Sequence, residues 1–100
     1  MATNTPKEEY GVCRILLDNE RVNVYEFCLG PWQKAGMHAH PEYVSYLLTD
    51  AKLRIKYDSG ISEDRGYKAG EAGYRQAQAH TIENMGGEEV KIIIVEWKNK

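Results

Sequence analysis

The sequence of 100 residues predicts one domain built entirely of β-strands, arranged as a sandwich or a barrel. No long window repeats its apolar side chains with the period of about 3.6 residues that marks an amphipathic helix. Short runs with apolar or alternating side chains follow one another instead. Gly, Pro, Asp and Asn residues, which favour turns, separate these runs at short intervals.

The first two strands are expected at residues 12–17 and 21–29, joined by the turn signal Asp18-Asn19-Glu20, and this pattern predicts a hairpin. Within the second run, Val22 and Val24 share one phase, whereas the aromatic side chains that follow share the other. Such a slip indicates either a β-bulge or burial on both faces of the strand.

The remaining strands follow at similar spacing. The run at 52–57 alternates cleanly, which is typical of a strand with one face in the core and one in solvent. The run at 90–97 is apolar on both faces, so we expect it at the centre of a sheet. The other expected strands are short and lie at 37–40, 44–48, 61–67, 74–76 and 79–84.

Composition excludes several classes of partner. The net charge is −2 and no block of Lys or Arg occurs, so neither a nucleic acid nor an anionic membrane is expected as a partner. The longest apolar run is far too short to span a membrane. Residues 1–9 are polar, lack the apolar core of a signal peptide and are expected to form a loose arm before a single domain at 10–100.

Two cysteines bear on location. Cys13 and Cys28 lie in apolar surroundings, and one disulfide between them is arithmetically possible. Because no secretory signal is visible, we expect two reduced thiols in the core and a cytoplasmic protein.

Two of the three histidines stand two residues apart, in Gly36-Met37-His38-Ala39-His40. In a strand, residues i and i+2 point to the same face with Cα atoms about 6.5–7 Å apart, so both imidazoles can reach one ion. Imidazole suits Zn, Fe, Cu or Ni. The alternative is a solvated or structural pair without a metal.

The third histidine, His80, falls on the expected strand at 79–84. On a regular strand it shares its face with Ile82 and Asn84, and with Gln76 and Gln78 upstream. A face with so many polar groups is unusual for a core, because buried polar groups need partners.

These residues resemble the two motifs of the cupin superfamily. Gly36 through His40, with the apolar strand that follows, resembles the first motif, and the stretch from Gly70 to His80-Thr81-Ile82-Glu83-Asn84 resembles the second. The resemblance covers residues 20–97. It implies a small RmlC-like cupin, a double-stranded β-helix or jelly-roll barrel of two antiparallel sheets, and a homodimer. It also implies one divalent metal ion, Fe, Mn, Zn or Ni, held inside the barrel by His38, His40 and His80.

The chain departs from the family pattern at the carboxylate ligand, which usually follows the second histidine by a few residues. That spacing reaches Val44 or Ser45, neither of which is a carboxylate. Glu42 shares the phase of His38 and His40 if Pro41 does not twist the strand, and is then a candidate fourth ligand; otherwise it is a surface residue of a loop. The Pro-x-Gly bend of the second motif is missing as well, with Gln76 and Gln78 near its place.

Several side chains could complete such a site. Tyr43 and Tyr46 are candidate catalytic proton donors because they are the tyrosines nearest in sequence to the histidine pair, although most tyrosines pack with their hydroxyl groups in water. Gln76 or Gln78 could orient a bound water or substrate. The expected inward-facing side chains include Val44, Tyr46 and Leu48. Arg54 and Arg75 are expected to point away from the pocket, which argues against a phosphorylated substrate.

Three functions remain open at the level of sequence. The first is a metal-dependent enzyme, a dioxygenase or an isomerase or lyase, acting on a small oxygenated organic molecule. The second is a non-catalytic module that binds or senses a small ligand. The third is a structural cupin that acts through oligomer formation. A chain of 100 residues has no room for a fused DNA-binding segment, which disfavours the sensor.

Overall fold

The computed structural model describes residues 11–98, so the arm expected at residues 1–9 lies outside the described residues. The described chain is all-β, as predicted, and the observed strands match the expected runs to within a few residues. They are β1 (Val12–Asp18), β2 (Val22–Leu29), β3 (Lys34–His40), β4 (Tyr43–Leu47), β5 (Ala51–Tyr57), β6 (Ser62–Tyr67), β7 (Ala72–Arg75), β8 (Gln78–Asn84) and β9 (Val90–Trp97).

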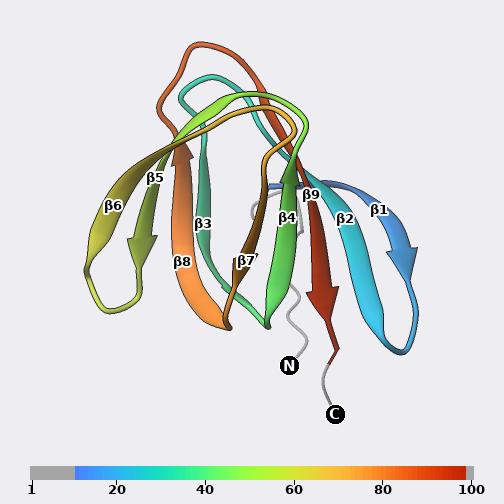
Figure 1. The fold of residues 1–100 in the computed structure, drawn as a ribbon. Coiled ribbons are helices and arrows are strands. Elements are labelled where there is room, and N and C mark those ends of the chain that lie inside the picture. Colours follow the sequence, from blue (N-terminus) through green and yellow to red (C-terminus); the bar gives the residue numbers. More distant parts are fainter. Residues whose placement is uncertain (1–10, 99–100) are drawn as a thin grey trace.

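The strands form two antiparallel sheets that face each other (Figure 1). One sheet has the order β1-β2-β9-β4-β7 and the other the order β3-β8-β5-β6. The apolar run β9 lies between β2 and β4, which confirms the expectation that it is a central strand. Within residues 11–98 no strand pairing joins the two sheets, so the jelly roll is an open sandwich rather than a closed barrel.

The core fills the space between the sheets. Alternate residues of β2 and β9 point inward from one sheet, and Leu53 and Ile55 of β5 point inward from the other. This follows from the two-residue period of a strand, which places every second side chain on the same face. The buried side chains from the first sheet are Tyr25, Phe27, Leu29, Val90, Ile92 and Ile94.

The phase of β4 differs from the prediction by one residue. Tyr43 and Leu47 are buried, whereas Tyr46 is 46% exposed and Val44 lies on the outer face with it. Leu48, which was also expected to face inward, is exposed. A shift of one residue moves every side chain of a strand to the opposite face. All the side chains that we expected to face inward on this strand therefore face outward. The Pro41-Glu42 bend between β3 and β4 breaks the phase that we extrapolated from the histidines.

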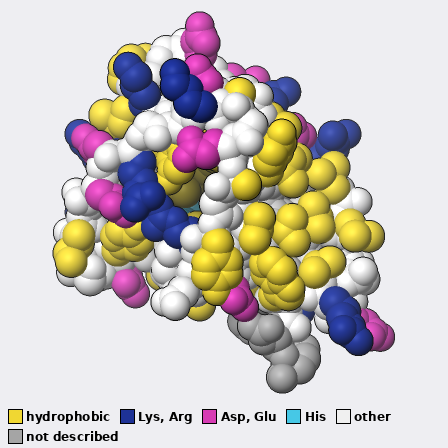
Figure 2. All heavy atoms as spheres, in the orientation of Figure 1, with side chains coloured by type: hydrophobic (Ala, Val, Ile, Leu, Met, Phe, Trp, Pro, Cys, Tyr) yellow, Lys and Arg dark blue, Asp and Glu magenta, His cyan; other side chains and the backbone are white. Residues whose placement is uncertain are grey.

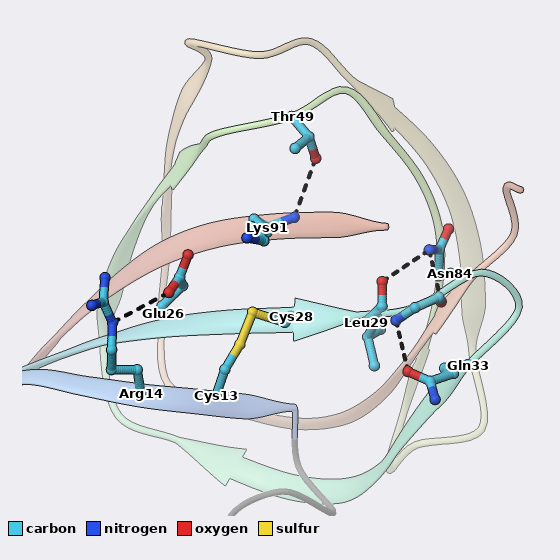
Figure 3. The surroundings of a disulfide bond; sticks show 10 residues. Cys13, Arg14, Glu26, Cys28, Leu29, Gln33, Thr49, Asn84 and Lys91 are labelled. Carbon is cyan, nitrogen blue, oxygen red and sulfur yellow. Dashed lines mark hydrogen bonds and ion pairs between the residues drawn. A yellow bond between two sulfur atoms is a disulfide. The ribbon is translucent and has the colours of Figure 1, made fainter. Parts of the chain in front are cut away.

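The expectation of two reduced core thiols is wrong. Cys13 on β1 and Cys28 on β2 form a disulfide, with Cα atoms 5.8 Å apart (Figure 3). Cys13 is exposed and Cys28 is half-buried, because both belong to a hairpin at the edge of the five-stranded sheet. The cytoplasmic expectation rested partly on reduced thiols and loses that support, since disulfides are typical of oxidising compartments. Among the described residues, no helix could cross a membrane.

Candidate metal centre

The structure brings the three histidines together. His38 on β3 lies directly opposite His80 on β8, and His40 follows two residues later on the same face. The ring centroids are 4.5 Å apart for His38 and His40, 4.8 Å for His38 and His80, and 4.9 Å for His40 and His80. All three are buried. The strand period accounts for the first pair, and the β3–β8 register adds the third member.

The Nδ1 atom of each histidine lies within hydrogen-bond distance of an oxygen that can accept a hydrogen bond but cannot donate one. His38 Nδ1 lies 2.6 Å from the carbonyl oxygen of Gly36, and His80 Nδ1 lies 2.6 Å from the side-chain oxygen of Gln78. His40 Nδ1 lies 2.6 Å from the carboxylate of Glu96. These acceptors assign the hydrogen of each ring to Nδ1, which leaves a lone pair on every Nε2 atom. Fixing the ring and its tautomer through the second nitrogen is the usual way in which a protein prepares a metal-binding histidine.

The residues fit a metal ion. Each histidine offers one ligand nitrogen, and these atoms lie within 4.8 Å of one another. The Nε2 atom of His80 is buried and, within the described part of the chain, has no hydrogen-bond partner. A buried polar atom without a partner costs about 1–3 kcal/mol, and coordination to an ion would satisfy it. The group could therefore hold a divalent transition metal ion.

Burial keeps two of the rings in the neutral form that binds metals. Burial, and after it the neighbouring His40, lower the pKa of His38 to about 4. Burial likewise lowers the pKa of His80 to about 3, with smaller contributions from His40 and His38. At neutral pH protons therefore do not compete for these two nitrogens.

Glu42 is not part of this group. Its carboxylate accepts a hydrogen bond from Tyr74 on β7, and its backbone carbonyl accepts one from the amide of Trp97 at 3.1 Å. The carboxylate next to the histidines is Glu96, which also accepts a hydrogen bond of 2.8 Å from the hydroxyl group of Tyr25. Sequence reasoning missed Glu96, although it continues the buried phase of Val90, Ile92 and Ile94 along β9 and interrupts it with a charge.

The two candidate tyrosines lie on opposite faces of β4. Tyr43 is buried, and its ring centroid lies 4.7 Å from that of His40. Burial raises the pKa of Tyr43 to about 12, so its hydroxyl group keeps its proton at neutral pH. Tyr46 points out of the sandwich, opposite Ile93 of β9, and is not beside the histidines.

The two glutamines also differ. Gln78, the first residue of β8, accepts the hydrogen bond from His80 Nδ1 and so contacts the histidine group directly. Gln76 is exposed, and its backbone carbonyl accepts a hydrogen bond from the Gln78 side chain at 3.3 Å. Only Gln78 is placed where it can orient a metal-binding ring.

A cavity of about 50 Å³ adjoins one of the three histidines, His40, and is lined also by Tyr43, Ser45, Tyr67, Arg75 and apolar side chains of the core. The presence of Arg75 there overturns the expectation that it points away. Arg75 pairs across the sheet with Tyr43, so the two side chains share the inner face. Arg54 does point outward, where it pairs with Asp64. A larger cavity of about 490 Å³ lies at the other ends of the strands, and no histidine lines it.

Comparison with known proteins rests on structure, since no protein-family model and no curated protein matches the sequence. A cupin domain from Bordetella pertussis is 27% identical, with a TM-score of 0.81 over 89% of this chain and 95% of that one. This chain has the cupin fold. An RmlC-like cupin from Methanocaldococcus jannaschii, described as a double-stranded β-helix, is 14% identical, with a TM-score of 0.69 over 97% of this chain and 86% of that one. A predicted oxalate decarboxylase from Thermotoga maritima is 20% identical, with a TM-score of 0.59 over 80% of this chain and 69% of that one.

Proposed function

We propose that this cupin is a metal-dependent enzyme whose substrate is a small oxygenated organic molecule bound beside the three histidines. One observation carries the proposal. His38, His40 and His80 are buried together, and every Nδ1 atom is committed to an oxygen acceptor, which leaves the Nε2 lone pairs for an ion. The buried Nε2 atom of His80 has no hydrogen-bond partner among the described residues, and a purely structural core would be expected to satisfy such an atom.

Three neutral ligands leave a divalent ion with its full charge, and when bound it would supply Lewis-acid polarisation of a substrate oxygen. Imidazole ligands do not select among Fe, Mn, Zn and Ni, so the identity of the metal stays open. Dioxygenase, isomerase and lyase chemistry all remain compatible with this ligand set. The neighbour from Thermotoga maritima is described as a predicted oxalate decarboxylase, which supports including a lyase among them.

The chain's own residues hold the site in place and supply a proton. Glu96 accepts hydrogen bonds from both His40 and Tyr25, which fixes the His40 ring. Tyr43 lies against that ring and retains its phenolic proton, so its hydroxyl group can donate a hydrogen bond to an anionic substrate oxygen. Apolar side chains of both sheets, such as Ile55 and Ile92, line the same cavity and limit the access of water.

A second candidate is a non-catalytic module that binds a small ligand. The cavity of about 50 Å³ is far smaller than the roughly 300–1,000 Å³ of pockets for drug-sized ligands, in enzymes and binding modules alike. A site of this size accepts a ligand of only a few non-hydrogen atoms unless the surrounding side chains move.

Metal analysis tests the proposal. Untagged wild-type protein is incubated in turn with Fe²⁺, Mn²⁺, Zn²⁺ and Ni²⁺, desalted and analysed for metal, together with His38→Ala and His80→Ala. We expect one ion per chain in the wild type and a loss in both variants, whereas Gln76→Ala, at an exposed position, keeps the ion. Absence of metal from the wild type after every incubation would overturn the proposal. Oxygen uptake with small carboxylic and hydroxy acids then separates a dioxygenase from a binding module.

A further inference from the structure

We propose that Arg75 binds the carboxylate group of a small organic ligand in the cavity that Arg75 and His40 line together. The inference deepens the proposed function. It rests on that function only for a second contact, between the same ligand and the metal ion. The contact between the carboxylate and the guanidinium group stands on the geometry of the described residues alone.

Arg75 reaches the histidines through two tyrosines. It lies opposite Tyr43 across the β4–β7 pair, and the Tyr43 ring centroid is 4.7 Å from that of His40. One guanidinium nitrogen donates to the hydroxyl group of Tyr57 at 3.1 Å, and the Tyr57 ring centroid is 6.3 Å from that of His80. Arg75 and His40 both line the cavity of about 50 Å³, so a small ligand in it can contact both side chains.

The charge of Arg75 is not neutralised by its neighbours. Its guanidinium group donates hydrogen bonds to the uncharged hydroxyl groups of Tyr57 and Tyr67, at 3.1 and 3.3 Å. Its ion-pair partner Glu63 is 3.9 Å away and is shared with Arg65, which lies closer to it at 3.3 Å. Two arginines against one carboxylate leave one net positive charge. A guanidinium group has five N–H donors, so capacity remains for a further acceptor.

The face of the molecule in Figure 2 is hollowed between the two sheets, and basic side chains lie on one side of the rim with acidic side chains near them. The Arg75 side chain is 22% exposed, so it stands between solvent and the cavity. An anion can therefore approach it from outside without first crossing the apolar core. A partly buried cation also attracts an anion more strongly than a fully solvated one.

A carboxylate suits this position better than a phosphate. Its single charge matches the one net positive charge, and its two coplanar oxygens match the planar fork of a guanidinium group. A phosphate group carries about 1.5 to 2 negative charges at neutral pH and has more oxygens to satisfy. The cavity of about 50 Å³ and its apolar walls also favour the smaller and less charged group.

The test uses the metal-free protein and compares acetate with acetamide, which has nearly the same shape but no charge. Isothermal titration calorimetry measures binding of acetate, acetamide and inorganic phosphate. We expect acetate to bind at least about tenfold more tightly than acetamide, because a hydrogen bond to a charged partner contributes more than a neutral one. Phosphate is expected to bind more weakly than acetate. Equal binding of acetate and acetamide, or stronger binding of phosphate, would overturn the inference.

Variants then assign the preference to Arg75. Arg75→Gln is expected to lose the preference for acetate and Arg75→Lys to keep part of it, while Arg54→Gln, which removes an exposed arginine on β5, leaves it unchanged. Thermal unfolding confirms that each variant is folded, and metal analysis shows whether the ion site is intact. Acetate binding that survives in Arg75→Gln contradicts the inference. Because these titrations need no metal, a failed metal site leaves their outcome interpretable.

Discussion

His80 and Asn84 lie on the same face of the same strand, are both 1% exposed, and differ in how their polar atoms are used. The side-chain nitrogen of Asn84 donates to the carbonyls of Leu29, Gly30 and Glu88 at 3.2, 2.9 and 2.8 Å (Figure 3 shows the first). Its oxygen accepts from the amide of Gly86 at 2.9 Å. His80 has one nitrogen bonded to Gln78 and the other buried without a partner among the described residues.

The difference separates a structural residue from a candidate metal ligand. Asn84 ties the end of β2 to the turn before β9, and every polar atom it buries is satisfied within the fold. His80 carries a buried nitrogen that the fold does not satisfy, which is stable only because the surrounding packing imposes it. The two ends of one motif, His-x-x-x-Asn, therefore serve different purposes.

The largest effect on stability is expected for Asn84→Ala. The change removes one donor and one acceptor and leaves buried carbonyl groups and an amide without partners, each of which costs about 1–3 kcal/mol. We expect the free energy of unfolding to fall by about 3 kcal/mol in urea titrations, while folded protein still binds metal. A fall below about 1 kcal/mol would mean that water or another side chain replaces the amide.

A change at His80 is expected to act through the ion rather than through the fold. In His80→Leu the metal-free protein should lose about 1 kcal/mol or less, because an unsatisfied nitrogen is replaced by an apolar group of similar size. Wild-type protein should gain about 2.7 kcal/mol with metal at about a hundred times its dissociation constant, and the variant should gain none. Thermal unfolding with and without Zn²⁺ measures both quantities. Equal metal stabilisation of the two proteins would remove His80 from the site.

Gln78 is expected to have a smaller effect, since it acts through His80. Gln78→Leu removes the acceptor of the Nδ1 hydrogen and should weaken metal binding by about 10–100-fold, as measured by competition with a chelating dye. Gln76→Leu is the matched control and should bind metal as the wild type does, because its side chain is exposed. The same loss in both variants would point to a general effect on β8 rather than to orientation of the ring.

The smallest effect is expected for Glu42→Gln. Its carboxylate contacts Tyr74 instead of the histidines, so metal affinity should change by less than about twofold, as is usual for a contact near the surface. Glu96→Gln provides the contrast, because the Glu96 carboxylate lies 2.6 Å from His40 Nδ1. This variant should lower metal affinity more than Glu42→Gln does. The reverse order would return Glu42 to the ligand set.

The site was predictable where it depended on local periodicity. The pair His38 and His40 shares a face in any extended strand, and the family resemblance joined His80 to it. Strand phase offered Gln76 and Gln78 equally, and the structure places Gln78 on His80. Tyr46, Arg75 and Glu42 were misplaced because their orientation was extrapolated through bends at Pro41 and near Gln76. A slip of one residue at a bend reverses the face of every residue beyond it.

By itself, the sequence determined the all-β class, the positions of the strands, the central place of β9 and the two histidine motifs, because these follow from the two-residue period and from turn chemistry along a continuous stretch of chain. The tertiary structure alone decided which distant side chains meet. It placed Glu96 on His40, Arg75 beside Tyr57, and Cys13 on Cys28. Such contacts depend on the register between strands and on the stacking of two sheets. The side-chain periodicity of a single strand determines neither of these.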